Sequence, residues 1–209
     1  MKKILMMVAA AMMAVVSVNA QQPVGGMWLK PMVGGTLSTV TKSDDAKMKL
    51  GIVAGGEFGY HVAEPFAVSA GLLVSMQGAK MKDNNYMRDE SSTMTYLNIP
   101  VLANFYLTKG LAIKAGLQPG FLLSRKWKGE ENVNGKWESF DESSTDGMKK
   151  FDLSIPFGLS YEISDFVIDA RYNLGLTKIV DSNLVDSKNS VIMLTIGYMI
   201  PFKTSLTRL

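Results

Sequence analysis

Seven charged residues lie in segments that are rich in apolar and small residues, and they are the side chains most able to do chemistry. They comprise three basic and four acidic groups: Lys30, Glu57, Lys114, Asp152, Glu162, Asp169 and Arg171. Charged groups inside a fold can pair, relay protons or hold a charged solute. Because an unpaired buried charge is costly, we expect a network of ion pairs that cross-links a polar interior. A proton or solute path is the alternative interpretation.

The single histidine, His61, is the other candidate for chemistry. A histidine beside a serine or a carboxylate can activate a nucleophile for acyl transfer. His61 falls on the Glu57 side of its segment, close to the segment's end, and the chain has no Gly-x-Ser-x-Gly motif. We interpret His61 as an ordinary residue and expect no enzymatic activity. A lipid-modifying enzyme that uses it stays open as an alternative.

The sequence offers no recognisable cofactor site. The chain has no cysteine and one histidine, so it lacks thiolates or a histidine pair for a metal. The carboxylates between Asp141 and Gly147 lack the spacing of an EF-hand calcium loop. No phosphate-binding loop or dinucleotide motif occurs. We therefore expect no bound metal or cofactor.

Eight segments of alternating apolar and polar residues carry the seven charges. A period of two is typical of β-strands with two unlike faces. The segments are long for a globular protein, and at a tilt near 45° each covers about 30 Å, the thickness of a bilayer's hydrocarbon core. Their ranges are Trp28–Thr41, Leu50–Val62, Phe66–Met81, Thr93–Leu107, Leu111–Arg125, Phe151–Ile163, Phe166–Ile179 and Ser190–Phe202.

The connections between these segments alternate in length. Short turns follow the second, fourth and sixth segments, at 63–65, 108–110 and 164–165, whereas the other connections are long polar loops. In an antiparallel arrangement all short turns then lie at one end, with both termini. Short periplasmic turns, long outer loops and an even strand count describe an outer-membrane barrel. We predict an all-β, eight-stranded antiparallel up-and-down transmembrane β-barrel with periplasmic termini.

Side-chain volume indicates which face of this barrel meets lipid. In the seventh segment Phe166, Ile168 and Ala170 alternate with Asp169 and Arg171. The interior of an eight-stranded barrel is only just wide enough for side chains, so the bulky apolar set is expected to face lipid. A basic residue at mid-bilayer on that face would cost about 2–4 kcal/mol, and the central apolar faces carry none. The alternative is a soluble lipocalin-like ligand-binding barrel, in which the bulky apolar side chains would face the interior and the polar ones the solvent.

Residues 1–20 have the pattern of a cleaved secretory signal peptide. Two lysines precede a short apolar run, and Val18 and Ala20 form a small-residue cleavage site. We expect residues 21–209 to form one barrel domain, with strands over about 28–202, in the outer membrane of a Gram-negative bacterium. Without the two lysines, 22 − 2 = 20 basic residues face 19 acidic ones, which gives no electrostatic basis for nucleic-acid binding. We expect a monomer whose partner is outer-membrane lipid.

The longest connection, residues 126–150, is the predicted interaction surface. It carries Trp127, Trp137 and Phe140 among many charges, and exposed loops often carry function. The dipeptide Asn134-Gly135 is a strong hairpin-turn signal, so we predict a short two-stranded extension above the membrane. A protein partner is expected to bind here; a solvated loop without a partner is the alternative.

Pro100 and Pro156 interrupt two segments at inward positions. The apolar alternation keeps its phase across both, so no inserted residue is required. Proline cannot donate to a β ladder. We therefore predict interrupted pairing at both prolines, with lumenal water or a polar side chain satisfying the carbonyl that loses its donor.

Three stretches resemble the PorT-like outer-membrane β-barrel family of Bacteroidetes. They are Y-L-x-I-P from Tyr96, A-G-x-x-P-G from Ala115 and D-A-R-Y-x-x-G-L from Asp169, and the similarity extends over residues 49–202. The resemblance implies a small integral barrel, and it implies an accessory role in protein secretion as one candidate function. Together with the residue patterns, it favours a non-enzymatic outer-membrane protein with a structural or interaction role, a plugged polar lumen and long extracellular loops.

Overall fold

The computed structural model describes residues 24–41, 45–181 and 187–202, which form a single antiparallel sheet of twelve strands. No helix in these residues is long and apolar enough to cross a membrane. The strands are β1 (Met27–Val40), β2 (Ala46–Lys47), β3 (Lys49–Ala63), β4 (Phe66–Met81), β5 (Met87–Asn98), β6 (Val101–Tyr106), β7 (Leu111–Val133), β8 (Lys136–Ser143), β9 (Phe151–Ile163), β10 (Phe166–Gly175), β11 (Asn189–Tyr198) and β12 (Ile200–Phe202).

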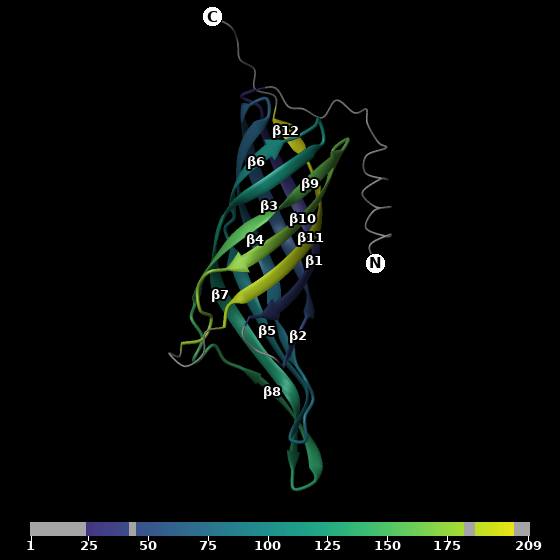
Figure 1. Cartoon of the computed structure of the whole chain (residues 1–209), viewed down its shortest axis with the longest axis vertical. Coiled ribbons are helices and arrows are strands. Elements are labelled where there is room, and N and C mark those ends of the chain that lie inside the picture. Colours follow the sequence, from purple (N-terminus) through teal and green to yellow (C-terminus); the bar gives the residue numbers. More distant parts are fainter. Residues whose placement is uncertain (1–23, 42–44, 182–186, 203–209) are drawn as a thin grey trace, which may run out of the picture.

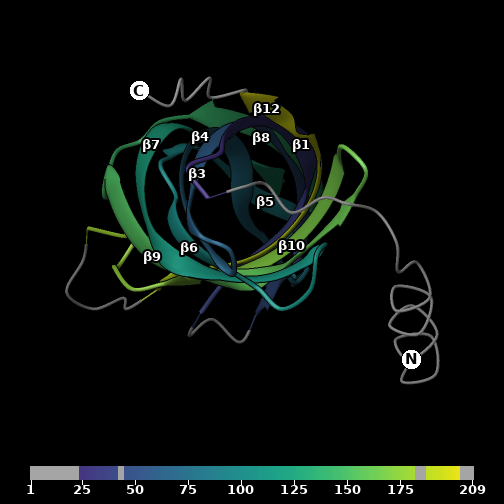
Figure 2. The same cartoon turned by 90° about the horizontal axis from the view of Figure 1, so that it is seen from above.

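The sheet closes into a ring, because β11 pairs with β1 through contacts such as Val33 with Ile196. Each strand of the ring pairs with antiparallel neighbours (Figures 1 and 2). Eight strand positions make up the ring: β5 and β6 share one, β11 and β12 share another, β2 extends the position of β3, and β8 lies outside. The predicted eight-stranded up-and-down barrel is confirmed.

The two faces of the wall also follow the prediction. On β11, Leu194 and Ile196 are each 56% exposed on the outside, whereas Thr195 between them is 1% exposed in the lumen. The same alternation places Ile168 outside and Asp169 inside on β10. Bulky apolar side chains thus form the outer surface, where lipid replaces water as the solvent. The soluble lipocalin-like alternative, which needs these side chains inside, is wrong.

The short turns and the chain's described ends lie together at one end of the barrel, which we call the short-turn end. Residues 64–65, 107–110 and 164–165 connect strand pairs there, and Met27 pairs with Phe202 beside them. The opposite end, which we call the long-loop end, carries the longer connections (Figure 1). This sorting agrees with the alternation of loop lengths in the sequence.

Several predicted strand limits are wrong at the long-loop end. β7 continues to Val133, well beyond the predicted limit at Arg125, and β5 begins at Met87 instead of Thr93. β10 ends at Gly175, four residues before the predicted Ile179. β5 and β7 pair with each other beyond the predicted limits, which supplies the backbone hydrogen bonds that extend them.

Pro100 is buried in the lumen and divides one wall position into β5 and β6. The backbone NH of Ile99 donates to the Pro119 carbonyl at 2.8 Å, and the NH of Gly71 donates to the Pro100 carbonyl at 2.9 Å. Pairing resumes in the same register on both sides, so no residue is inserted. Because hydrogen-bonded antiparallel pairs exchange two bonds, the Gly71 carbonyl is the acceptor that loses its donor.

Pro156 is buried too, but it lies within the continuous strand β9. It pairs with Asn173 on β10, whereas the pairing of β9 with β7 stops at Phe157 and resumes at Ser154. The ladder is therefore interrupted beside both prolines without an inserted residue, as predicted. The satisfaction of the freed carbonyls by water or a polar side chain stays a prediction.

Trp28 is buried in the barrel near the short-turn end, where it packs with Val167 and Met199. Its indole ring lies directly over the position that a side chain at Gly59 would fill. Replacing Gly59 with valine is therefore expected to destabilise the barrel by about 1–3 kcal/mol, the usual cost of overpacking. Urea unfolding in detergent micelles measures the change. Gly35→Val is the control, since only the Gly51 carbonyl, at 3.8 Å, lies near its added carbon; an equal loss in both variants would contradict the prediction.

Candidate functional site

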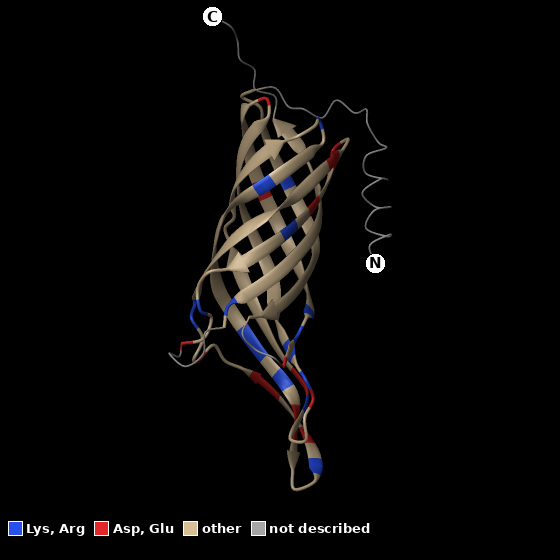
Figure 3. Cartoon of the chain, in the orientation of Figure 1, with Lys and Arg blue, Asp and Glu red and all other residues tan. Residues whose placement is uncertain are grey.

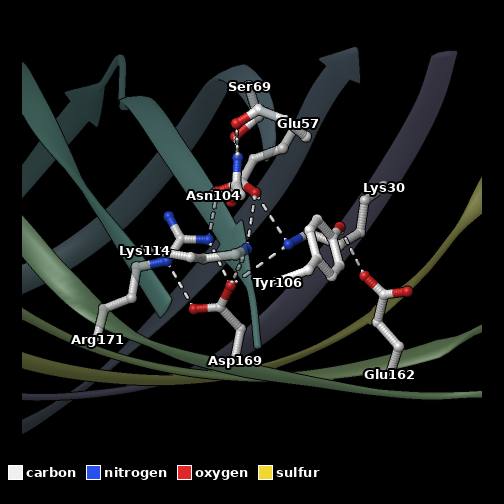
Figure 4. A network of polar contacts seen from close by, with 10 residues as sticks. Lys30, Glu57, Ser69, Asn104, Tyr106, Lys114, Glu162, Asp169 and Arg171 are labelled. Atoms are coloured by element: carbon white, nitrogen blue, oxygen red, sulfur yellow. Dashed lines mark hydrogen bonds and ion pairs between the residues drawn. The ribbon is translucent and has the colours of Figure 1, made fainter. Parts of the chain in front are cut away.

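Five of the seven predicted lumenal charges meet in one place, which we call the charge cluster: Lys30, Glu57, Lys114, Asp169 and Arg171 (Figure 4). They come from β1, β3, β7 and β10. Strand register explains the meeting, because Lys30 lies directly opposite Glu57, while Lys114 and Arg171 both lie opposite Gly158 on β9. A Cβ added at Gly158 would meet the backbone carbonyl oxygen of Ala170 on β10, so glycine at this position allows β9 and β10 to approach closely beside the two cations.

The carboxylates of the charge cluster each contact more than one cation. Lys30 Nζ lies 2.9 Å from Glu57 Oε2, and Lys114 Nζ lies 2.6 Å from Asp169 Oδ2. Arg171 donates from Nε and Nη2 to the two oxygens of Asp169, at 2.6 and 2.8 Å, and also pairs with Glu57. All five side chains are at most 4% exposed. Such buried, multiply bonded charges hold their strands at fixed distances.

The other two predicted charges lie outside the charge cluster. Asp152 accepts hydrogen bonds from Thr177 Oγ1 at 2.7 Å and from Asn189 Nδ2 at 2.8 Å. Glu162 accepts a hydrogen bond from the Tyr106 hydroxyl at 2.9 Å. The structure therefore places all seven groups in the lumen but does not join them in one network. Inward alternation identifies such residues, whereas their partners depend on strand register.

Neutral polar residues of the lumen were missed by the sequence reasoning, which considered charges alone. Asn104 donates to Ser69 Oγ at 3.0 Å, and Asn98 and Gln77 both donate to Ser75 Oγ at 2.8 Å. All of them occupy inward positions of the alternation, which was the available signal. The bonds from Asn98 and Asn104 join β5 and β6 to β4, their neighbour in the wall, whereas the bond from Gln77 lies within β4.

The lumen is also less polar than the sequence suggested. An apolar layer of Met32, Val53, Leu73 and Met193 fills part of it, and each of these side chains is at most 5% exposed. A second apolar cluster lies nearer the long-loop end and contains Met94, Tyr96, Leu122 and Ile179. The lumen therefore combines the expected polar groups with apolar layers, because inward residues also pack on one another to fill the volume.

His61 is buried at the short-turn end, where its ring centroid lies 5.2 Å from that of Tyr106. Tyr106 in turn bonds Glu162, so the described surroundings of His61 are an aromatic ring and, beyond it, a carboxylate. No serine hydroxyl is hydrogen-bonded to His61 in the described part of the chain. This geometry gives no activated nucleophile of the kind that acyl transfer requires.

Beyond the wall at the long-loop end, β5, β7 and β8 form a three-stranded sheet, which we call the projecting sheet (Figure 1). Asn134 and Gly135 have φ values of 54° and 82°, as a tight hairpin turn requires. The hairpin predicted in residues 126–150 is confirmed. The predicted extension had two strands, whereas the structure has three, because β5 from Met87 onward pairs with β7.

The three predicted aromatic residues do not share one surface of the projecting sheet. Trp127 and Phe140 meet edge to face with ring centroids 4.9 Å apart, and Trp127 Nε1 donates to Glu90 at 2.9 Å. Trp137 lies on the other face, where the guanidinium of Arg88 stacks 4.1 Å from its ring. Each aromatic residue thus stabilises the projection on its own side.

Charged residues are numerous along the projecting sheet (Figure 3). Asp141 lies 3.4 Å from Lys126 Nζ and 3.2 Å from Lys128 Nζ, on the face that also carries Trp137. The hydrogen bond from Lys128, helped by the charge of Lys126, lowers the pKa of the Asp141 carboxyl. Because these groups are exposed, their ion pairs contribute little to the stability of the projecting sheet. Their main effect is to keep its surface hydrated.

A closed eight-stranded barrel with an apolar outer wall and an ion-paired lumen defines a class, the small integral barrels of the Gram-negative outer membrane. Residues 20–181 match the family described as outer membrane protein beta-barrel domain, and the chain belongs to that family. The protein is therefore an outer-membrane β-barrel protein in contact with outer-membrane lipid. No curated protein sequence is significantly similar to this chain.

Several solved structures are similar to this chain at low sequence identity. The crystal structure of Ail, the attachment invasion locus protein of Yersinia pestis, is 20% identical, with a TM-score of 0.50 over 85% of this chain and 100% of that one. Neisserial surface protein A is 12% identical, with a TM-score of 0.45 over 84% and 97%. OprG from Pseudomonas aeruginosa is 13% identical, with a TM-score of 0.44 over 89% and 100%.

Proposed function

We propose that this protein is a non-enzymatic barrel that anchors an extracellular interaction surface, with a lumen that does not conduct. The observation that carries the proposal is the combination of a cross-linked interior and an ordered sheet beyond the membrane-spanning wall. The interior supplies rigidity, and the projecting sheet supplies a surface outside the lipid.

The plugged lumen is supported by contacts that run across the barrel. Lys30 and Glu57 on neighbouring strands reach Lys114, Asp169 and Arg171, which come from other sides of the ring (Figure 4). The apolar layer around Leu73 adds a second obstruction with almost no exposed surface. In planar bilayers we expect no stable conductance steps; large, long-lived channels would show that the interior is open.

We propose that the projecting sheet lies outside the cell. Barrels of this class have short turns on the periplasmic side and long connections outside, and the projecting sheet belongs to the long-loop end. Exposed segments carried by a rigid scaffold are where binding residues are most often found. We propose a protein partner for the face that carries Trp137 and Arg88, because aromatic and arginine side chains are enriched at binding hot spots.

The orientation can be tested with single cysteines, because the native chain contains none. We expect Ser139→Cys in β8 to react with a membrane-impermeant maleimide on intact cells, since Ser139 is exposed on the projecting sheet. The matched variant Asp165→Cys, in a short turn, is expected to react only after the outer membrane is opened. Labelling of Asp165→Cys alone on intact cells would reverse the proposed orientation.

The partner of the projecting sheet can be tested by cross-linking. A photoreactive amino acid in place of Trp137 is expected to yield a specific adduct in intact cells. The same amino acid in place of Leu50, which is 76% exposed at the rim of the wall, serves as the control. Identical adduct patterns at both positions would argue against a dedicated interaction surface.

An accessory role in protein secretion is the second candidate, and the PorT-like stretches from Tyr96, Ala115 and Asp169 favour it. Loss of secreted proteins in a deletion strain, restored by the native chain, would support this role. A second strain would express a chain in which a short turn replaces the β8 hairpin. If this chain also restored the secreted proteins, the secretion role would need only the barrel and would be distinct from the interaction role of the projecting sheet.

A further inference from the structure

A pocket of about 290 Å³ opens at the long-loop end of the barrel. Three methionines, Met81, Met94 and Met148, line it together with Ile179 and Val180. Its floor belongs to the apolar cluster that contains Met94 and Ile179, so the pocket ends above the closed part of the lumen.

Backbone contacts between loops hold one side of this pocket in place. Met148 and Val180 form an isolated β-bridge, and the NH of Lys149 donates to the Ile179 carbonyl at 2.9 Å. The NH of Ile179 donates in turn to the Ser187 carbonyl at 3.0 Å. The apolar lining is thus built by the fold and is more than a gap between exposed loops.

One cation, Arg125, reaches this apolar lining. Its Nε donates to Ser92 Oγ at 3.3 Å, and its guanidinium carbon lies 5.8 Å from the ring of Trp127. Both partners are neutral. Across the described residues no carboxylate pairs with Arg125, in contrast to Lys30, Lys114 and Arg171, which each pair with carboxylates. The guanidinium keeps donors for an anion at the edge of an apolar pocket.

We propose that this pocket binds a small organic anion with an apolar body, such as a medium-chain carboxylate. A dry apolar cavity of about 150 Å³ suffices for benzene, so this pocket has room for a short alkyl chain or a ring. Methionine side chains adapt to different apolar shapes, and a guanidinium binds a carboxylate through two parallel hydrogen bonds. This ligand site is independent of the interaction role proposed above.

Nuclear magnetic resonance of methionine methyl groups tests the site on the whole protein in zwitterionic lipid nanodiscs, with octanoate as the probe. We expect saturable shifts at Met81, Met94 and Met148, and none at Met76, which is 39% exposed on the outer wall. Octan-1-ol, which lacks the charge, should bind about ten-fold or more weakly, as loss of a charge-assisted hydrogen-bond pair predicts. Equal shifts at Met76 would show partition into lipid only and would overturn the proposal.

Two charge-matched variants separate the site from general electrostatics. Arg125→Gln is expected to weaken octanoate by about ten-fold or more and leave octan-1-ol unchanged. Lys126→Gln removes the neighbouring charge, which points away from the pocket and pairs with Asp141, and should change neither ligand. Unchanged octanoate affinity in Arg125→Gln would overturn the proposal.

An anionic lipid of the membrane also combines an apolar chain with a negative charge and could occupy the same pocket. A third set of binding measurements distinguishes such a lipid from a free small anion. Octanoate affinity is expected to stay unchanged in nanodiscs that contain lipopolysaccharide. Competitive loss of octanoate binding there would contradict the assignment to a free small anion.

Discussion

Replacing Asp169 with asparagine is expected to destabilise the barrel by about 3–5 kcal/mol, the cost of removing one partner from a buried ion pair. Asp169 contacts Lys30, Lys114 and Arg171 within the lumen. Without its charge these three cations share only Glu57 within the charge cluster, and their mutual repulsion is poorly screened there. Urea unfolding from detergent micelles, followed by the gel mobility shift of the folded barrel, measures the loss.

The control is the same substitution at Asp165, an exposed turn residue that accepts a hydrogen bond from the Tyr198 hydroxyl at 3.2 Å. We expect a change of no more than about 0.5 kcal/mol there. Adding Lys114→Met to Asp169→Asn should recover part of the lost stability, because it removes one of the stranded cations. Similar losses at Asp169 and Asp165, or no recovery in the double variant, would argue against an energetic role for the charge cluster.

Replacing Leu194 with arginine on the outer wall is expected to destabilise the barrel by about 2–4 kcal/mol, the penalty for a basic residue at the bilayer midplane. Leu194 is 56% exposed on β11 and lies opposite Gly35 and Ala170, in the middle of their strands. The guanidinium would have no polar partner in hydrocarbon at this height. Unfolding from liposomes is the appropriate measurement, since detergent reduces the penalty.

The depth dependence is tested by Leu50→Arg, at the long-loop rim of the wall. Leu50 is even more exposed than Leu194, at 76%, but near the interface the arginine can reach water. The expected penalty there is about 0–1 kcal/mol. If Leu50→Arg cost as much as Leu194→Arg, the outer wall would not be positioned in lipid as the alternation implies.

The barrel and its lipid-facing surface could be predicted from the sequence, because both depend on local patterns. A strand's side chains alternate with a period of two, so Ile168 and Asp169 had to lie on opposite faces whatever their neighbours. Loop lengths fixed the end at which the turns lie. The Asn134-Gly135 turn was predictable for the same reason, since its positive φ values are a property of those two residues.

The partners of each lumenal group could not be predicted, because they depend on how far each strand is shifted along its neighbour. Lys114 meets Asp169 only because β7, β9 and β10 place Lys114, Gly158 and Arg171 in one row. A shift of two residues would preserve every inward-facing position and still exchange these contacts. Likewise, the extension of β5 from Met87 depends on its pairing with β7, since β-structure is stabilised by cross-strand contacts.

The sequence by itself thus determined which side chains face lipid and which face the lumen, since that choice is made residue by residue along each strand. Only the tertiary structure decided that Lys30, Glu57, Lys114, Asp169 and Arg171 form one cluster and that Arg125 stands apart at an apolar pocket. The physical reason is that closing the sheet into a barrel fixes how far each strand is shifted along its neighbour. That shift decides which side chains from different strands lie at the same height in the lumen.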